Sequence, residues 1–107
     1  MLETGTASLL EELKSRLLQS ADLLKGFGVL KVAVFGSVLH GDFGEESDLD
    51  LLVEFEPDRT PGLGFFRLES QLSRNLGRKV DLNTPGFLSP RFRDEVVTEA
   101  QTVYEQA

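Results

Sequence analysis

The feature that most constrains this chain is residues 32–56, VAVFGSVLHGDFGEESDLDLLVEFE, where two apolar runs flank a polar loop. The first run ends in Gly36-Ser37 and the second begins with Asp48-x-Asp50, with ten residues between Ser37 and Asp48. Both runs are short and rich in strand-forming residues, which favours strands over helices. The segment therefore predicts a sheet, with one polar site at the end of one strand and another at the start of the next.

The two runs differ in their patterning. Residues 30–35, LKVAVF, are apolar at both alternations, which is typical of a central strand covered on both faces. Residues 48–56 alternate, so one face of that strand is apolar and the other carries Asp48, Asp50 and two glutamates. Residues 79–83, KVDLN, repeat the alternation on a third strand, with Asp81 on its polar face.

Helices are expected between and around these strands. Ser8 and Glu11 have capping-box spacing, and apolar residues at three- and four-residue steps predict one helix that ends near Gly26 or Gly28. Residues 60–61, Thr-Pro, predict the start of a second helix that Gly77 ends. Ser89-Pro90 predicts a last helix, followed by a short strand at 102–104.

Composition excludes several classes of site and partner. The 107 residues suit a single domain over 1–107, and the absence of cysteine excludes disulfides and thiolate chemistry. The single histidine excludes a multi-histidine metal site. A net charge of −7 disfavours direct nucleic-acid binding, because phosphate contacts need lysine and arginine. We find no secretory signal or membrane span in the sequence, which fits a cytoplasmic protein.

The three aspartates are the candidate metal ligands. Two residues of a strand span about 6.6 Å, so Asp48 and Asp50 present their carboxylates to one region. Asp81 is the natural third carboxylate if its strand lies beside residues 48–55. Carboxylate oxygens suit Mg²⁺, and three such groups could hold two ions that align a hydroxyl with a phosphorus. Each aspartate alone would instead be read as an exposed charge on a solvated strand face.

Gly36 and Ser37 are the candidate phosphate site. Glycine allows close approach of the backbone to a ligand, and Ser37 offers a hydroxyl and an N–H at the start of a short helical turn. An ordinary turn is the alternative interpretation of this pair. What makes the phosphate hypothesis specific is its combination with Asp48 and Asp50 in one small chain.

Gly36-Ser37, the ten-residue spacer, Asp48-x-Asp50 and a later strand bearing Asp81 resemble the signature of the nucleotidyltransferases related to DNA polymerase β. The whole chain is similar to the minimal nucleotidyltransferases, or MntA-like antitoxins, through FGSVLHGDFGEESDLDLLVEFEP, RTPGL and GRKVDLNTPGFLSP. The resemblance implies an α/β (α+β) fold, with a mixed sheet of three to four strands flanked by helices. It also implies Asp48, Asp50 and Asp81 as catalytic Mg²⁺ ligands, and Gly36 and Ser37 as contacts to the phosphates of ATP.

The same resemblance implies a partner. Relatives are often encoded beside a HEPN-type toxin, and some transfer AMP from ATP to a tyrosine of that toxin, as in type VII-like toxin–antitoxin pairs. This chain has His40 where many relatives have arginine, so His40 is expected to be a weaker, pH-dependent phosphate contact. One alternative is a non-catalytic antitoxin that acts by contact. Another is a small-molecule nucleotidyltransferase, which would need a homodimer to supply a substrate surface.

Overall fold

The computed structural model describes residues 5–39, 48–59 and 61–106. Its centre is a four-stranded sheet in the order β3-β2-β1-β4. Strand β1 (Val29–Phe35) pairs antiparallel with both β2 (Leu49–Phe55) and β4 (Gln101–Glu105), whereas β2 pairs in parallel with β3 (Val80–Asn83). The sheet is therefore mixed, and the expectation of a mixed sheet flanked by helices is confirmed.

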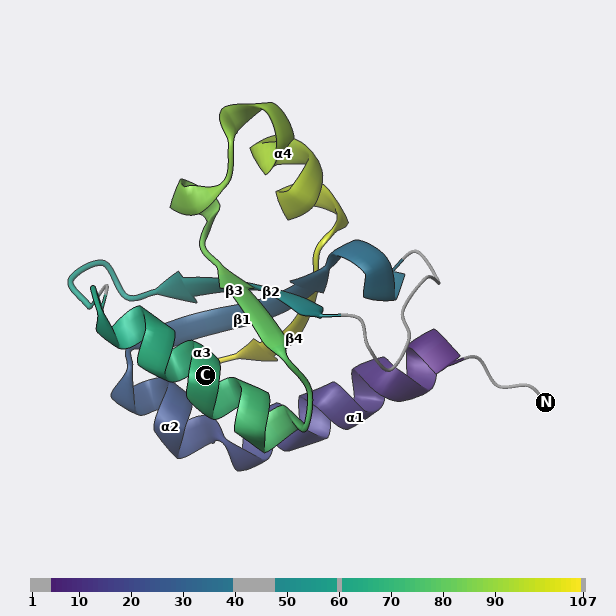
Figure 1. Cartoon of the computed structure of the whole chain (residues 1–107), viewed down its shortest axis with the longest axis horizontal. Helices are drawn as coiled ribbons and strands as arrows, with labels where there is room; N and C mark the ends of the chain where they lie inside the picture. Colours follow the sequence, from purple (N-terminus) through teal and green to yellow (C-terminus); the bar gives the residue numbers. More distant parts are fainter. Residues whose placement is uncertain (1–4, 40–47, 60, 107) are drawn as a thin grey trace.

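Helices α1 (Gly5–Gln19), α2 (Ala21–Gly26) and α3 (Gly64–Leu76) gather along one side of the sheet (Figure 1). They cover a core to which these three helices and all four strands contribute, with Leu17, Leu68 and Val32 completely buried. Helix α4 (Pro90–Glu99) projects from the opposite side of the sheet (Figure 1). The described residues contain no helix long and apolar enough to cross a membrane.

The expectation of one helix, capped at Ser8 and ending near Gly26 or Gly28, was wrong in two respects. The helix starts at Gly5, so Ser8 lies inside α1 and is not its cap. A turn at Ser20 then separates α1 from α2. The buried Ser20 hydroxyl donates to the Arg16 carbonyl at 3.1 Å and accepts from the Asn75 side chain of α3 at 3.0 Å, so the break is stabilised by a contact between helices.

The expected start of α3 was also wrong. The helix begins at Gly64, beyond Pro61, and Thr60 lies outside the described residues. Gly62 has a φ of +59°, which no residue of a right-handed helix adopts, so the chain completes a turn before the helix starts. The other end is as expected, because Gly77 takes a left-handed conformation and its N–H donates to the Ser73 carbonyl.

The C-terminal elements follow the sequence closely. After β3 the chain makes a 3-10 turn, η2 (Pro85–Phe87), and then enters α4 at Ser89-Pro90. The Ser89 hydroxyl accepts from the Arg91 N–H, which confirms the predicted cap. None of the α4 side chains, all of which the structure describes, is buried, and the Arg93 guanidinium ties the helix to the Pro85 and Leu88 carbonyls. Strand β4 confirms the predicted final strand.

Candidate active site

The parallel pairing of β2 and β3 brings two of the predicted aspartates together. Asp50 lies opposite Asp81 in the register of these strands, and Leu49 lies opposite Val80. Asp48 immediately precedes β2 and is exposed. The sequence left open whether the strand of Asp81 lies beside that of Asp50, and the structure confirms that it does.

The pKa of Asp50 is raised above its ordinary value of 3.8. The largest cause of the higher pKa is desolvation, because Asp50 is half-buried on β2. The charges of Asp81 and Asp48 raise the pKa further, and so does a side-chain hydrogen bond with Asp81. The negative charges of Asp81 and Asp48 beside it favour the binding of a proton or a cation at Asp50.

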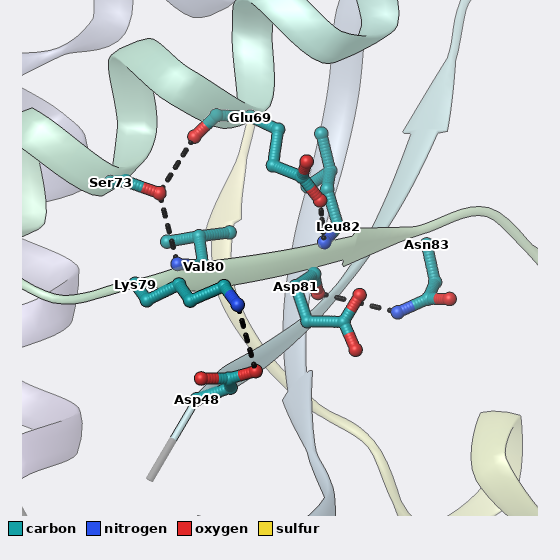
Figure 2. A network of polar contacts seen from close by, with 8 residues as sticks. All are labelled: Asp48, Glu69, Ser73, Lys79, Val80, Asp81, Leu82 and Asn83. Carbon is teal, nitrogen blue, oxygen red and sulfur yellow. Dashed lines mark hydrogen bonds and ion pairs between the residues drawn. The ribbon is translucent and has the colours of Figure 1, made fainter. Parts of the chain in front are cut away.

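Asp48 lies near the ammonium group of Lys79, a residue that the sequence analysis did not single out. Its Oδ2 lies 3.9 Å from the Lys79 Nζ (Figure 2), and 79% of the Lys79 side chain is exposed. Within the described part of the chain, no three acidic or histidine side chains converge closely enough to hold a metal ion. The structure thus pairs Asp50 with Asp81 and places Asp48 at the edge of the pair, and a three-aspartate metal site stays a prediction.

Gly36 lies against the acid pair. Phe35 is opposite Asp50 in the β1–β2 register, and the chain turns directly afterwards into η1 (Gly36–Leu39). Gly36 has a φ of +79°, and a Cβ at this position would overlap the Asp50 Oδ2 and lie 3.2 Å from its Cγ. Only glycine therefore fits this approach without displacing the carboxylate.

The rest of the predicted phosphate site is only partly described. The Ser37 backbone belongs to η1, and its side chain lies outside what the structure describes. His40 lies outside the described residues altogether. The expected roles of Gly36, Ser37 and His40 at nucleotide phosphates therefore stay predictions.

Helix α3 supplies a second group of residues that the sequence analysis missed. The Glu69 carboxylate accepts from the Leu82 N–H at 2.8 Å, and the Ser73 hydroxyl accepts from the Val80 N–H at 2.9 Å (Figure 2). A sequence signal for both exists, because they are four residues apart and each directly follows a buried position of the helix, Leu68 or Leu72. Polar residues at such positions indicate a specific polar partner within the fold.

Two hollows that the structure describes do not contain the aspartates. A cavity of about 450 Å³ lies between α1 and the end of α3, and a smaller one of about 280 Å³ lies beside the end of β2 and Thr84. The acid pair belongs to neither. The facing carboxylates and the raised pKa of Asp50 mark the candidate site instead, because perturbed titratable groups cluster at functional sites.

A family model described as "Polymerase beta, Nucleotidyltransferase" matches residues 9–107. The chain belongs to this nucleotidyltransferase family. A Thermococcus cleftensis relative named protein adenylyltransferase MntA is 44% identical over 92 residues, which are 84% of this chain and 91% of the relative. A Methanocaldococcus jannaschii relative, provisionally named a protein adenylyltransferase, is 38% identical over 92 residues, covering 84% of this chain and 92% of the relative.

Solved structures agree with this assignment. One that is provisionally described as a minimal nucleotidyltransferase has a TM-score of 0.70 and 44% identity, covering 85% of this chain and 92% of that chain. A complex of an MNT antitoxin with a tri-AMPylated Shewanella oneidensis HEPN toxin has a TM-score of 0.62 and 20% identity, covering 88% and 73% of the chains. At that identity the likeness shows the fold alone. The polymerase β-like fold implied by the sequence is therefore confirmed for this nucleotidyltransferase.

Proposed function

We propose that this nucleotidyltransferase transfers AMP from ATP to a hydroxyl of a partner protein in a Mg²⁺-dependent reaction. The observation that carries the proposal is the placement of Asp50 opposite Asp81, with the pKa of Asp50 raised and Gly36 flush against its carboxylate. The names of the relatives support AMP as the transferred group, since two of them are described as protein adenylyltransferases.

The residues present fit a hard divalent cation. Carboxylate oxygens are the ligands that Mg²⁺ prefers. The pKa of Asp50 is raised mainly by burial and further by the negative charges of Asp81 and Asp48, which a cation would neutralise. Asp48 and Asp50 would hold two ions, and Asp81 would complete the ligands of one of them. When bound, Mg²⁺ supplies charge neutralisation at the phosphates and aligns the attacking and leaving oxygens.

The protein's own residues would bind the nucleotide and manage the proton. The Gly36 backbone admits a phosphate beside Asp50, and the Ser37 N–H and hydroxyl hold the terminal phosphates, with His40 as an additional contact. The acceptor oxygen forms a bond to the α-phosphorus, the bond between the α- and β-phosphates breaks, and pyrophosphate leaves. The acceptor proton passes to Asp81, which is exposed on the open face beside Asp50.

The acceptor hydroxyl must come from another molecule if it is a tyrosine. The chain has a single tyrosine, Tyr104, and only 5% of it is exposed. We propose a HEPN-type toxin as the partner and one of its tyrosines as the acceptor, so that transfer neutralises the toxin. The AMPylated HEPN toxin in complex with an MNT antitoxin supports this choice of partner.

A non-catalytic antitoxin that acts by contact is the second candidate. His40 in place of the family's arginine favours it, because neutral histidine is a weaker phosphate donor than a guanidinium. The two candidates differ in one outcome. Contact alone predicts that toxin neutralisation survives loss of the aspartates, whereas catalysis predicts that it does not.

The test is transfer of label from α-labelled ATP and Mg²⁺ to the HEPN-type protein encoded nearby. We expect transfer by the unaltered protein and a loss of about 100-fold or more in Asp48→Ala/Asp50→Ala. Glu54→Gln is the matched control, because Glu54 is exposed on the same strand and should transfer label normally. Transfer that survives the double substitution would show that the site is wrongly assigned.

A further inference from the structure

We propose that Glu69 and Ser73 of α3 are positioning residues that hold β3 so that Asp81 stays opposite Asp50. The inference rests on the proposed function, because it concerns how one of its carboxylates is placed. Neither side chain is assigned to the binding of metal or nucleotide. Both act on the backbone of the strand that carries Asp81.

Strand β3 needs support from outside the sheet. It is the last strand on its side and pairs with β2 alone. In such a strand every second N–H points away from the sheet, and an unsatisfied, partly buried N–H is costly. Here the outward N–H groups of Val80 and Leu82 both donate to α3 side chains, to Ser73 Oγ at 2.9 Å and to Glu69 Oε2 at 2.8 Å.

Glu69 and Ser73, which we call the two anchors, bind the strand on either side of Asp81. Ser73 accepts from the N–H of Val80, the residue before Asp81, and Glu69 accepts from the N–H of Leu82, the residue after it. Figure 2 shows Glu69 and Ser73 reaching the strand from α3, while the Asp81 carboxylate points away from that helix. The Asp81 side chain is exposed, so packing does not fix it. Its position therefore depends on the backbone of β3, which is held by the pairing with β2 on one side and by these two hydrogen bonds on the other.

The spacing of the two anchors matches the strand. Four residues of a helix rise about 6.0 Å, and two residues of a strand span about 6.6 Å. Glu69 and Ser73 are four apart, and the N–H groups that they accept from are two apart, so both bonds form at good length together. The Ser73 hydroxyl also donates to the Glu69 carbonyl at 2.9 Å, which fixes its orientation for the Val80 N–H.

The exact position of the Asp81 carboxylate matters for group transfer. A displacement of about 1 Å in a catalytic group can cost on the order of 100-fold in rate. Removal of an anchor should therefore lower kcat for AMP transfer. The KM for ATP should change little, because Gly36 and Ser37, on the other side of Asp50, are proposed to bind the nucleotide.

The kinetic test compares Glu69→Ala, Glu69→Gln and Ser73→Ala, with Ser70→Ala as the control on an exposed position of α3. We expect Glu69→Ala and Ser73→Ala to lower kcat about tenfold or more and to leave KM within about twofold. Glu69→Gln keeps an acceptor oxygen and should retain kcat within about threefold. If Gln costs as much as Ala, the charge of Glu69 is what matters, and the positioning role is overturned.

Amide hydrogen exchange gives a readout that does not need activity. In Glu69→Ala we expect exchange of the Leu82 and Asp81 amides to rise about tenfold or more over the unaltered protein, whereas Ser70→Ala should not change them. Unchanged exchange at Asp81 would overturn the inference even if transfer is slowed. If the unaltered protein transfers no AMP, the proposed function fails, and the exchange result still decides whether the anchors hold Asp81.

Discussion

Substitution of Asp50 by asparagine should stabilise the metal-free protein while it abolishes transfer. The pKa of Asp50 is raised by desolvation and by the charges of Asp81 and Asp48, so the folded state holds its proton more tightly than the unfolded chain. The stability linked to that proton is fully present below the ordinary pKa of 3.8 and is lost as pH rises through the higher folded pKa. At neutral pH the charged carboxylate therefore destabilises the fold.

The expected gain is small, because Asp50 is only half-buried and solvent screens its neighbours. Favourable cross-strand pairs contribute about 0.2–1 kcal/mol and like charges directly opposite each other are destabilising, so we expect the like-charge pair to cost an amount of the same order. Asparagine keeps the shape of the side chain and can donate a hydrogen bond to Asp81. We therefore expect Asp50→Asn to raise the free energy of unfolding by about 0.5 kcal/mol at pH 7, which raises Tm by about 2–4 °C.

The assay is thermal unfolding between pH 4 and pH 8 in the presence of a chelator. The advantage of Asp50→Asn should be largest at neutral pH and should shrink toward pH 4, as the unaltered Asp50 becomes protonated. Addition of Mg²⁺ or Mn²⁺ should stabilise the unaltered protein more than the variant. Glu54→Gln, at an exposed position of the same strand, is the control. An Asp50→Asn protein that is less stable at pH 7 in chelator would refute the reasoning.

Three further predictions concern other positions. Gly36→Ala should lower the free energy of unfolding by at least about 1–2 kcal/mol, because the φ of +79° is left-handed and the added Cβ would overlap the Asp50 carboxylate. Denaturant titration measures this loss. Lys79→Met should lower the Mg²⁺ concentration for half-maximal transfer about two- to fivefold, because the Lys79 ammonium competes with Mg²⁺ for Asp48. A metal titration in which the variant needs more Mg²⁺ than the unaltered protein would contradict this. Phe92→Ser on α4, where 56% of Phe92 is exposed, should change stability by less than about 0.5 kcal/mol in the same titration.

The strands could be predicted from the sequence because their patterns are local. Alternation in 48–56 and 79–83 placed Asp50 and Asp81 on strand faces, and the structure bears out both strands. Which strands pair is a property of the whole fold, so the contact between Asp50 and Asp81 could only be stated as a condition. Lys79 was missed for the same reason, since its approach to Asp48 follows from the β2–β3 register.

The helix boundaries depended on contacts that no local pattern contains. Apolar spacing continues from Leu17 through Ala21, so the turn at Ser20 is invisible without its hydrogen bond to Asn75 of α3. The sequence did contain a signal for Glu69, because a charged residue beside the buried positions of a helix needs a polar partner within the fold. The identity of that partner, the N–H of Leu82, again required the position of α3 against the sheet edge.

The central claim is that Asp50 and Asp81 jointly bind the cation that AMP transfer requires. A metal-preference test on Asp81→Cys addresses it most directly, because a thiolate is a poor ligand for Mg²⁺ and a good one for softer ions such as Cd²⁺. We predict that Asp81→Cys loses transfer to the partner about 100-fold or more in Mg²⁺ and regains at least about tenfold in Cd²⁺, whereas Asp81→Ala regains nothing. Transfer by Asp81→Cys in Mg²⁺ at the rate of the unaltered protein would contradict the claim.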